Sequence, residues 1–119
     1  MFCITATVAF RASHQIQLYD GSLEPLHEHL WKVKVTVRAA ELDRIGVVMD
    51  FHELERRLRD VTGALDGRRL NDLAAFATMN PSAENVALHI AREVSLPDNV
   101  RLESVEVWET AENSAVYRA

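Results

Sequence analysis

The 119-residue sequence has little cysteine and little positive charge. Cys3 is the only cysteine, so no internal disulfide can form and a reducing compartment is indicated. The formal net charge is −5. An acidic chain lacks the clustered positive potential that nucleic acids and anionic membranes require, so we expect neither as a partner.

Long apolar runs are absent as well. None approaches the roughly 20 residues that a membrane-spanning helix needs, and the first residues lack the basic-then-apolar pattern of a secretory signal. We therefore expect a cytoplasmic protein. What the sequence does have is 48% hydrophobic residues, which is ordinary for a globular fold. Its length favours one domain, residues 1–119.

Two long segments alternate between apolar and more polar side chains. Residues 2–14 carry the apolar side chains at even positions, and residues 27–38 carry them at odd positions. A period of two indicates strands, and residues 19–25 between the segments have turn chemistry. We predict two antiparallel strands joined by a long loop, with one wet face.

Helical spacing follows in the middle of the chain. Asp50 is predicted to cap a helix whose apolar stripe extends to Leu65. A second helix is predicted to begin at Asn80-Pro81, a cap residue followed by proline at the first helical position. Further strands are expected at about 101–110 and 114–118. The order ββααββ predicts an α+β domain with both helices on one face of the sheet.

Three histidines lie at the ends of the first two predicted strands. His14 ends the apolar parity of the first strand, and His27 and His29 begin that of the second. Residues i and i+2 of a strand share a face, so an antiparallel pairing brings all three imidazoles to one place. Three imidazoles suit zinc and leave a fourth position open. The alternative is ordinary polar residues at a strand boundary.

Glu109 is the second unusual position. It has the parity of Val105 and Val107, which places a carboxylate on an otherwise apolar strand face. A buried carboxylate needs a partner, and a ligand with paired N–H donors would supply one. Exposure at the end of the strand is the alternative interpretation.

Six segments, in chain order, carry a family pattern: F-R-A-S-H at 10–14, L-H-E-H at 26–29, G-V-V-M-D-F at 46–51, L-D-G-R-R-L-N at 65–71, N-P-S-A-E-N at 80–85 and V-W-E-T at 107–110. Together they resemble the 6-pyruvoyl-tetrahydropterin synthase family and the related bacterial 6-carboxy-tetrahydropterin synthases. The resemblance implies the tunnelling fold, with a four-stranded antiparallel sheet and two helices on one face. It also implies a homohexamer, built as a dimer of trimers, with active sites between subunits.

The resemblance also implies roles for residues. The family's zinc ligands fall on His14, His27 and His29. Its pterin-anchoring glutamate falls on Glu109, and Thr110 beside it belongs to the same substrate-binding motif. A carboxylate can accept two hydrogen bonds from the amino and N–H edge of a pterin.

The sequence departs from the family at two catalytic positions. The usual cysteine, four residues before the first histidine of the H-x-H pair, is Leu23. The usual Asp-His pair is Asp66-Gly67, so the histidine of the proton relay is missing. The metal ligands are present while two acid–base groups are absent, which argues against the usual synthase reaction.

Glu24 offers a replacement base. It lies three residues before His27, and it resembles the glutamate that one subgroup of the family uses in place of cysteine. Those enzymes cleave 7,8-dihydroneopterin triphosphate to 6-hydroxymethyl-7,8-dihydropterin. A solvated loop residue is the alternative for Glu24. We expect a zinc-dependent lyase of tetrahydrobiopterin, folate or queuosine biosynthesis, with Glu24 as base and Asp66 assisting. The alternative is a homologue that binds zinc and pterin without turnover.

Overall fold

The first half of the chain forms the two long antiparallel strands that its alternation predicts. In this computed structural model, which describes residues 1–119, they are β1 (Phe2–His14) and β2 (His27–Ala39). Their register pairs Phe2 with Ala39 at one end and His14 with His27 at the other. Apolar positions of both strands face the core, so the predicted parity is confirmed.

Three further strands complete the sheet: β3 (Arg68–Arg69), β4 (Arg101–Trp108) and β5 (Ser114–Arg118). The order across the sheet is β3-β1-β2-β4-β5. The expected four antiparallel strands are present, but the sheet has five strands. The added β3 runs parallel to β1. Two exposed residues carry no alternation, so nothing local in the sequence indicated this strand.

Two helices lie between the long strands and the end of the chain. The first is α1 (Phe51–Thr62), and the Asp50 carboxylate caps it by accepting two backbone N–H groups. The second is α2 (Ala83–Glu93), with Ser82 as its cap. The predicted start of this helix at Asn80-Pro81 is therefore wrong. The side chain of Asn80 instead bonds the backbone of Gln17. Short 3₁₀ turns, η1 (Leu70–Asp72) and η2 (Ala74–Phe76), precede α2.

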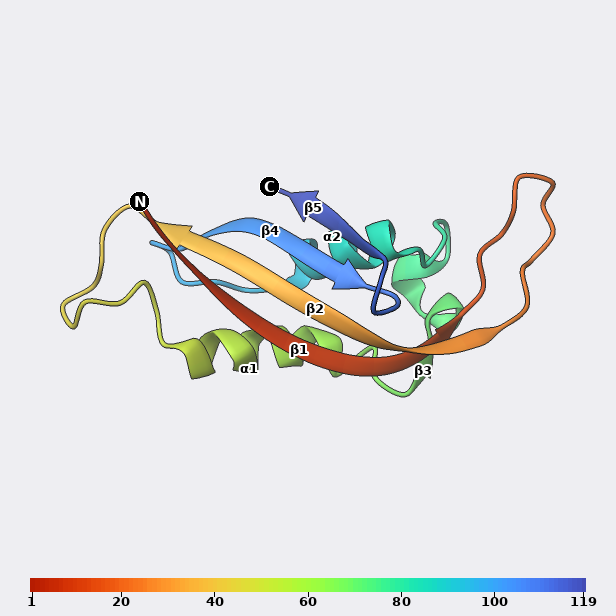
Figure 1. Cartoon of the computed structure of the whole chain (residues 1–119), viewed down its shortest axis with the longest axis horizontal. Coiled ribbons are helices and arrows are strands. Elements are labelled where there is room, and N and C mark those ends of the chain that lie inside the picture. Colours follow the sequence, from red (N-terminus) through yellow and green to blue (C-terminus); the bar gives the residue numbers. More distant parts are fainter.

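The core lies between one face of the sheet and the two helices. α1 packs against β1, and α2 packs against β4 and β5. Trp31, Leu54, Leu58 and Ile90 are among the largest fully buried side chains. Figure 1 shows β1 and β2 as a long curved ribbon that ends in a protruding loop. Neither helix has the length and apolar character needed to cross a membrane.

Candidate metal centre

The register of β1 and β2 brings three histidines to one end of the core-facing side of the sheet. His14 lies opposite His27, and His29 lies opposite Ala12. The ring centroids are 4.5 Å apart for His14 and His27, 4.6 Å for His27 and His29, and 5.5 Å for His14 and His29. The fully buried Trp31 lies beneath them, edge-on to His14 at 4.9 Å. The gathering of the imidazoles follows from strand alternation, as the sequence predicted.

Backbone carbonyls determine which ring nitrogen of two histidines is available. Nδ1 of His14 lies 2.7 Å from the carbonyl oxygen of Pro81, and Nδ1 of His27 lies 2.9 Å from that of Pro25. A carbonyl oxygen only accepts, so each Nδ1 donates its N–H and the neutral ring presents a bare lone pair at Nε2. Metal-binding histidines are oriented in this manner.

Nε2 of His14 is buried and has no hydrogen-bond partner. An unpartnered buried polar atom is costly unless something else binds it. A metal ion held by nitrogen donors fits this atom, because its lone pair points to where the other two imidazoles converge. The residues present therefore fit the metal that the family pattern implies, and imidazole suits zinc among several divalent metals.

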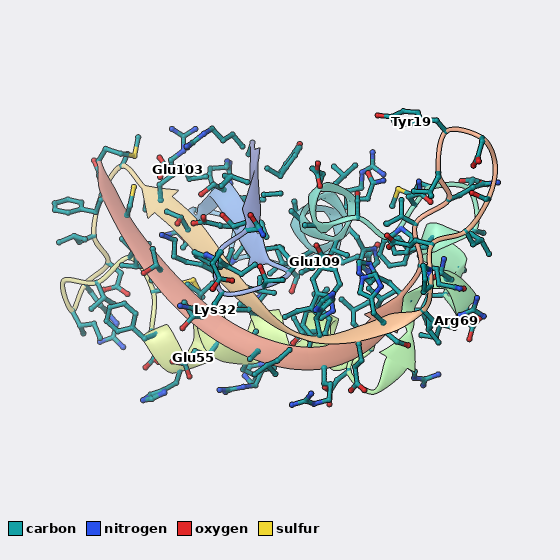
Figure 2. The ribbon with its side chains drawn as sticks, turned by 45° about the vertical axis from the view of Figure 1, so that its right-hand side comes forward. Tyr19, Lys32, Glu55, Arg69, Glu103 and Glu109 are labelled. Carbon is teal, nitrogen blue, oxygen red and sulfur yellow. The ribbon has the colours of Figure 1, made fainter.

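Glu109 adds a carboxylate to the three histidines. Its Oε1 lies 2.6 Å from Nε2 of His14, 3.9 Å from that of His27 and 3.8 Å from that of His29. One ligand atom from each of the four residues lies within 4.8 Å of every other. Figure 2 shows Glu109 at the turn between β4 and β5, over the curve of the β1–β2 ribbon. The carboxylate that strand parity singled out thus lies among the three histidines and could supply a fourth ligand atom.

Thr110 shapes the turn that carries this glutamate. Its hydroxyl oxygen accepts from the backbone N–H and the side-chain amide of Asn113, each at 3.2 Å. The backbone N–H of Glu109 donates to the Asn113 carbonyl at 3.2 Å. These bonds hold the backbone of Glu109 and leave its side chain to the histidines.

Burial lowers the pKa of the His29 imidazole, because the protonated ring loses hydration. The nearby Glu109 carboxylate opposes this by raising the pKa, and His27 and His14 add to the lowering. Metal binding requires neutral imidazole. The environment of His29 therefore favours its ligand form.

Glu24 lies at the rim of the cluster, in the loop between β1 and β2. Its Oε1 is 3.7 Å from Nε2 of His27 and accepts the backbone N–H of Ile16 at 3.1 Å. The backbone N–H of Glu24 donates to the Ile16 carbonyl at 3.0 Å, and this bond joins the two sides of the loop next to the histidines. The neighbouring Leu23 side chain is 55% exposed. The loop thus places the Glu24 carboxylate near the histidines, whereas the adjacent Leu23 side chain points to solvent.

Two asparagines clamp the segment after His14. Asn71 bonds both the backbone N–H and the carbonyl of Gln15, each at 2.9 Å. Asn80 does the same for Gln17, at 2.8 and 3.0 Å. Sequence reasoning assigned no role to Asn71 and placed Asn80 as a helix cap, a position that Ser82 occupies in the structure. Both asparagines belong to segments of the family pattern, which was the only signal for their contacts with Gln15 and Gln17.

Asp66 lies at the outer edge of β1. Its Oδ1 accepts the backbone N–H of Arg11 at 2.9 Å, and the N–H of Gly67 donates to the Arg11 carbonyl at 2.7 Å. It is not a member of the four-residue cluster. Gly67 has a φ of +73°, which a side chain adopts only with strain. The position where the family has its relay histidine is therefore a left-handed turn in this chain.

A cavity of about 160 Å³ opens beside the carboxylate of Glu109 and is lined by Ala83, Glu84, Glu109, Asn113, Ser114 and Ala115. A larger apolar cavity, about 430 Å³, lies at the other end of β1, beside Phe2, Ile45 and Phe51. None of the candidate site residues lines it. Of these two cavities, only the small polar one is lined by a residue of the four-residue cluster, Glu109.

Comparisons with known proteins show what the whole chain is similar to. Residues 3–119 match the family described as 6-pyruvoyl tetrahydropterin synthase. A 6-carboxy-5,6,7,8-tetrahydropterin synthase from Synechocystis is 32% identical over 122 residues, 98% of this chain and 93% of that one. Human 6-pyruvoyl tetrahydrobiopterin synthase is 30% identical, covering 97% and 90%. The structure of the Caenorhabditis elegans 6-pyruvoyl tetrahydropterin synthase superposes with a TM-score of 0.83 at 25% identity, covering 99% and 95%.

Proposed function

Because the chain belongs to the 6-pyruvoyl tetrahydropterin synthase family, we propose that it is a zinc-dependent lyase acting on 7,8-dihydroneopterin triphosphate or a related dihydropterin. The observation that carries the proposal is the convergence of three imidazole Nε2 atoms and the carboxylate of Glu109 beside a polar cavity. With Glu24 3.7 Å from one of those imidazoles, an acid–base group stands next to the metal centre.

His14, His27 and His29 would hold the metal through Nε2. A bound zinc ion acidifies a coordinated hydroxyl and polarises a developing carbonyl. The two backbone carbonyls that accept from His14 and His27 fix the orientation of those rings. The buried face of Trp31 beneath them keeps water from that side of the site.

Glu24 is proposed as the base. Cleavage of the bond between C1′ and C2′ of the substrate side chain requires the C2′ hydroxyl to lose its proton as C2′ becomes a carbonyl. C1′ must gain a proton as the hydroxymethyl product forms. One carboxylate can carry this proton from the first site to the second, so no oxidant is required. The Ile16 N–H holds one oxygen of Glu24 in place for that transfer.

Glu109 and Thr110 are proposed to bind the pterin ring, with the carboxylate accepting the paired N–H donors of the ring. Asp66 is exposed beside the outer edge of β1, a position that suits contact with a second copy of the chain. In the homohexamer expected from the family, Asp66 is proposed to assist the chemistry of a site that two copies complete.

The test is incubation of the zinc-loaded protein with 7,8-dihydroneopterin triphosphate, followed by chromatographic identification of the products. We expect 6-hydroxymethyl-7,8-dihydropterin from the unmodified protein and at least about a hundredfold lower rate from Glu24→Gln, as is typical for loss of an acid–base group. Glu28→Gln is the matched control, because Glu28 points to the opposite face, 3.7 Å from exposed Arg11. Full turnover by Glu24→Gln would show that another group is the base.

A second candidate is a homologue that binds zinc and dihydropterin without turnover. The exposed Leu23 and the left-handed Gly67, at the positions of two catalytic groups of the family, favour it. Tight binding of the dihydropterin with unchanged substrate would support this candidate over the lyase.

A further inference from the structure

The carboxylate of Glu109 is placed for a cation rather than for hydrogen bonds. No N–H or O–H group donates to either of its side-chain oxygens with hydrogen-bond geometry. Yet Oε1 lies 2.6 Å from Nε2 of His14 and within 3.9 Å of the same atom of His27 and His29. Because Nδ1 of His14 donates to Pro81, a neutral His14 presents a lone pair to this oxygen.

Two acceptors at that separation repel each other unless a cation lies between them or next to both. A proton would bridge one nitrogen and one oxygen, and the contact to His14 lacks the alignment of a hydrogen bond. A metal ion serves three nitrogens and one oxygen together. Zinc takes four ligands, and carboxylate oxygen is one of its ordinary donors. The arrangement therefore suits a metal ion held by the three histidines and Glu109 together.

The Glu109 side chain also has room to move away from the three histidines. Its backbone is held by the Thr110–Asn113 turn, while its side chain is 31% exposed and borders the cavity of about 160 Å³. Rotation about its own side-chain bonds would turn the carboxylate from the histidines toward that cavity without moving β4.

Pairing with a pterin edge requires both carboxylate oxygens as acceptors, side by side. An oxygen bound to a metal among three imidazoles is not free for that pairing. We propose that Glu109 is an exchangeable fourth ligand of the metal. It closes the coordination sphere while the site is empty, and the arriving ring draws it away, which opens the position for the substrate's hydroxyls. In naming a dihydropterin as the displacing ligand, this inference rests on the proposed function.

The test uses the full-length protein loaded with Co²⁺, whose visible absorption bands report the ligands directly. Spectra and Zn²⁺ affinity are compared for the unmodified protein, Glu109→Gln and Glu109→Ala, with no pterin present. We expect both variants to show shifted bands and at least about tenfold weaker Zn²⁺ binding. Glu112→Gln, which removes the same charge from the exposed part of the same turn, should match the unmodified protein. Saturation with 7,8-dihydroneopterin should shift the bands of the unmodified protein.

Identical spectra and affinities for the unmodified protein and both Glu109 variants would overturn the proposal. So would bands of the unmodified protein that stay fixed when 7,8-dihydroneopterin saturates the site, because then no exchange occurs. The isosteric glutamine keeps the test valid if the alanine variant does not fold. A spectral difference in a protein without turnover would sustain this inference while removing the lyase assignment.

Discussion

At the scale of single residues, His14 and His89 show how differently burial acts on histidine. His14 is fully buried, with one ring nitrogen on the Pro81 carbonyl and the other facing the metal centre. His89, on α2, is half-buried against the ring of Phe76 at 5.5 Å. Loss of hydration lowers the pKa of His89, and the nearby Glu93 carboxylate opposes that lowering. His89 therefore packs against Phe76, and its lowered pKa makes the stability of the protein depend on pH.

The consequence is a loss of stability in acid. In the unfolded chain His89 takes up a proton near pH 6.5, and in the folded protein it does so only at lower pH. Between the two pKa values the unfolded state holds more protons, so the free energy of unfolding falls as pH drops below 6.5. Above that pH the residue is neutral in both states and contributes no pH dependence.

We expect His89→Gln to reduce this acid sensitivity. Urea unfolding at a series of pH values from about 7.5 to 5, within the usual titration range of histidine, measures the free energy for both proteins. The variant's curve should fall less steeply below pH 6.5. His52→Gln, at a side chain that is 92% exposed on α1, is the control. Parallel curves for His89→Gln and the unmodified protein would contradict the prediction.

At the scale of elements, the metal centre depends on segments that contribute no ligand. The chain after His14 is bound by Asn71, which follows β3, and by Asn80, which precedes α2. Pro81 accepts from the ring of His14 itself. Loop 15–26 in turn carries Glu24. Both asparagines lie between α1 and α2, on either side of η2, and they clamp the segment after His14 to that region.

Asn71→Ala should loosen this clamp. Both backbone partners on Gln15 lose their bond in a half-buried place, so we expect a loss of about 1–3 kcal/mol in the free energy of unfolding. Metal affinity should fall too, and the Gln15 amide should exchange its hydrogen faster. Chemical denaturation, chelator competition and hydrogen exchange measure the three effects. Asn99→Ala, in an exposed turn, is the control. Unchanged metal affinity in Asn71→Ala would show that the clamp serves the loop alone.

At the scale of the whole molecule, the chain is more extended than a compact protein of its size. Its radius of gyration is 15.3 Å, against about 13.5 Å expected for its length. The loop with Tyr19 at its tip protrudes from one end (Figure 2). Both edges of the sheet are open: β5, with Val116 and Tyr117 44% and 37% exposed, and most of β1 beyond the short β3. Open edges of this kind pair with other chains.

We therefore expect the protein to sediment as an oligomer, with six copies of 13.4 kDa giving about 80 kDa. Analytical ultracentrifugation measures the mass. Val116→Lys should weaken the assembly, because it adds a charge to the open edge formed by β5. Within the chain the substituted side chain lies opposite Glu106, a partner of opposite charge. Leu30→Lys makes a similar change at an exposed position of the inner strand β2 and is the control. A monomer at all concentrations would contradict the expected assembly.

What the sequence alone determined is what strand and helix geometry encode locally. The shared face of His14, His27 and His29 follows from a period of two, which depends only on neighbouring residues. The parity of Glu109 and the apolar stripe of α1 follow from the same kind of rule. The departures at Leu23 and Gly67 could be identified because both positions are fixed relative to segments of the family pattern.

The tertiary structure decided what no local rule contains. It placed Glu109, far along the chain, 2.6 Å from His14. Asn80 and Pro81, expected to start a helix, instead form hydrogen bonds: Asn80 bonds the backbone of Gln17, and the Pro81 carbonyl accepts from the ring of His14. The fold also added β3, whose two residues have no periodicity to detect. Such contacts depend on how the helices and the sheet pack as a whole. That packing is stabilised by many individually weak van der Waals contacts between residues that are distant in the sequence. The grouping of the three histidines is therefore predictable from the sequence, whereas the approach of Glu109 to them appears only in the fold.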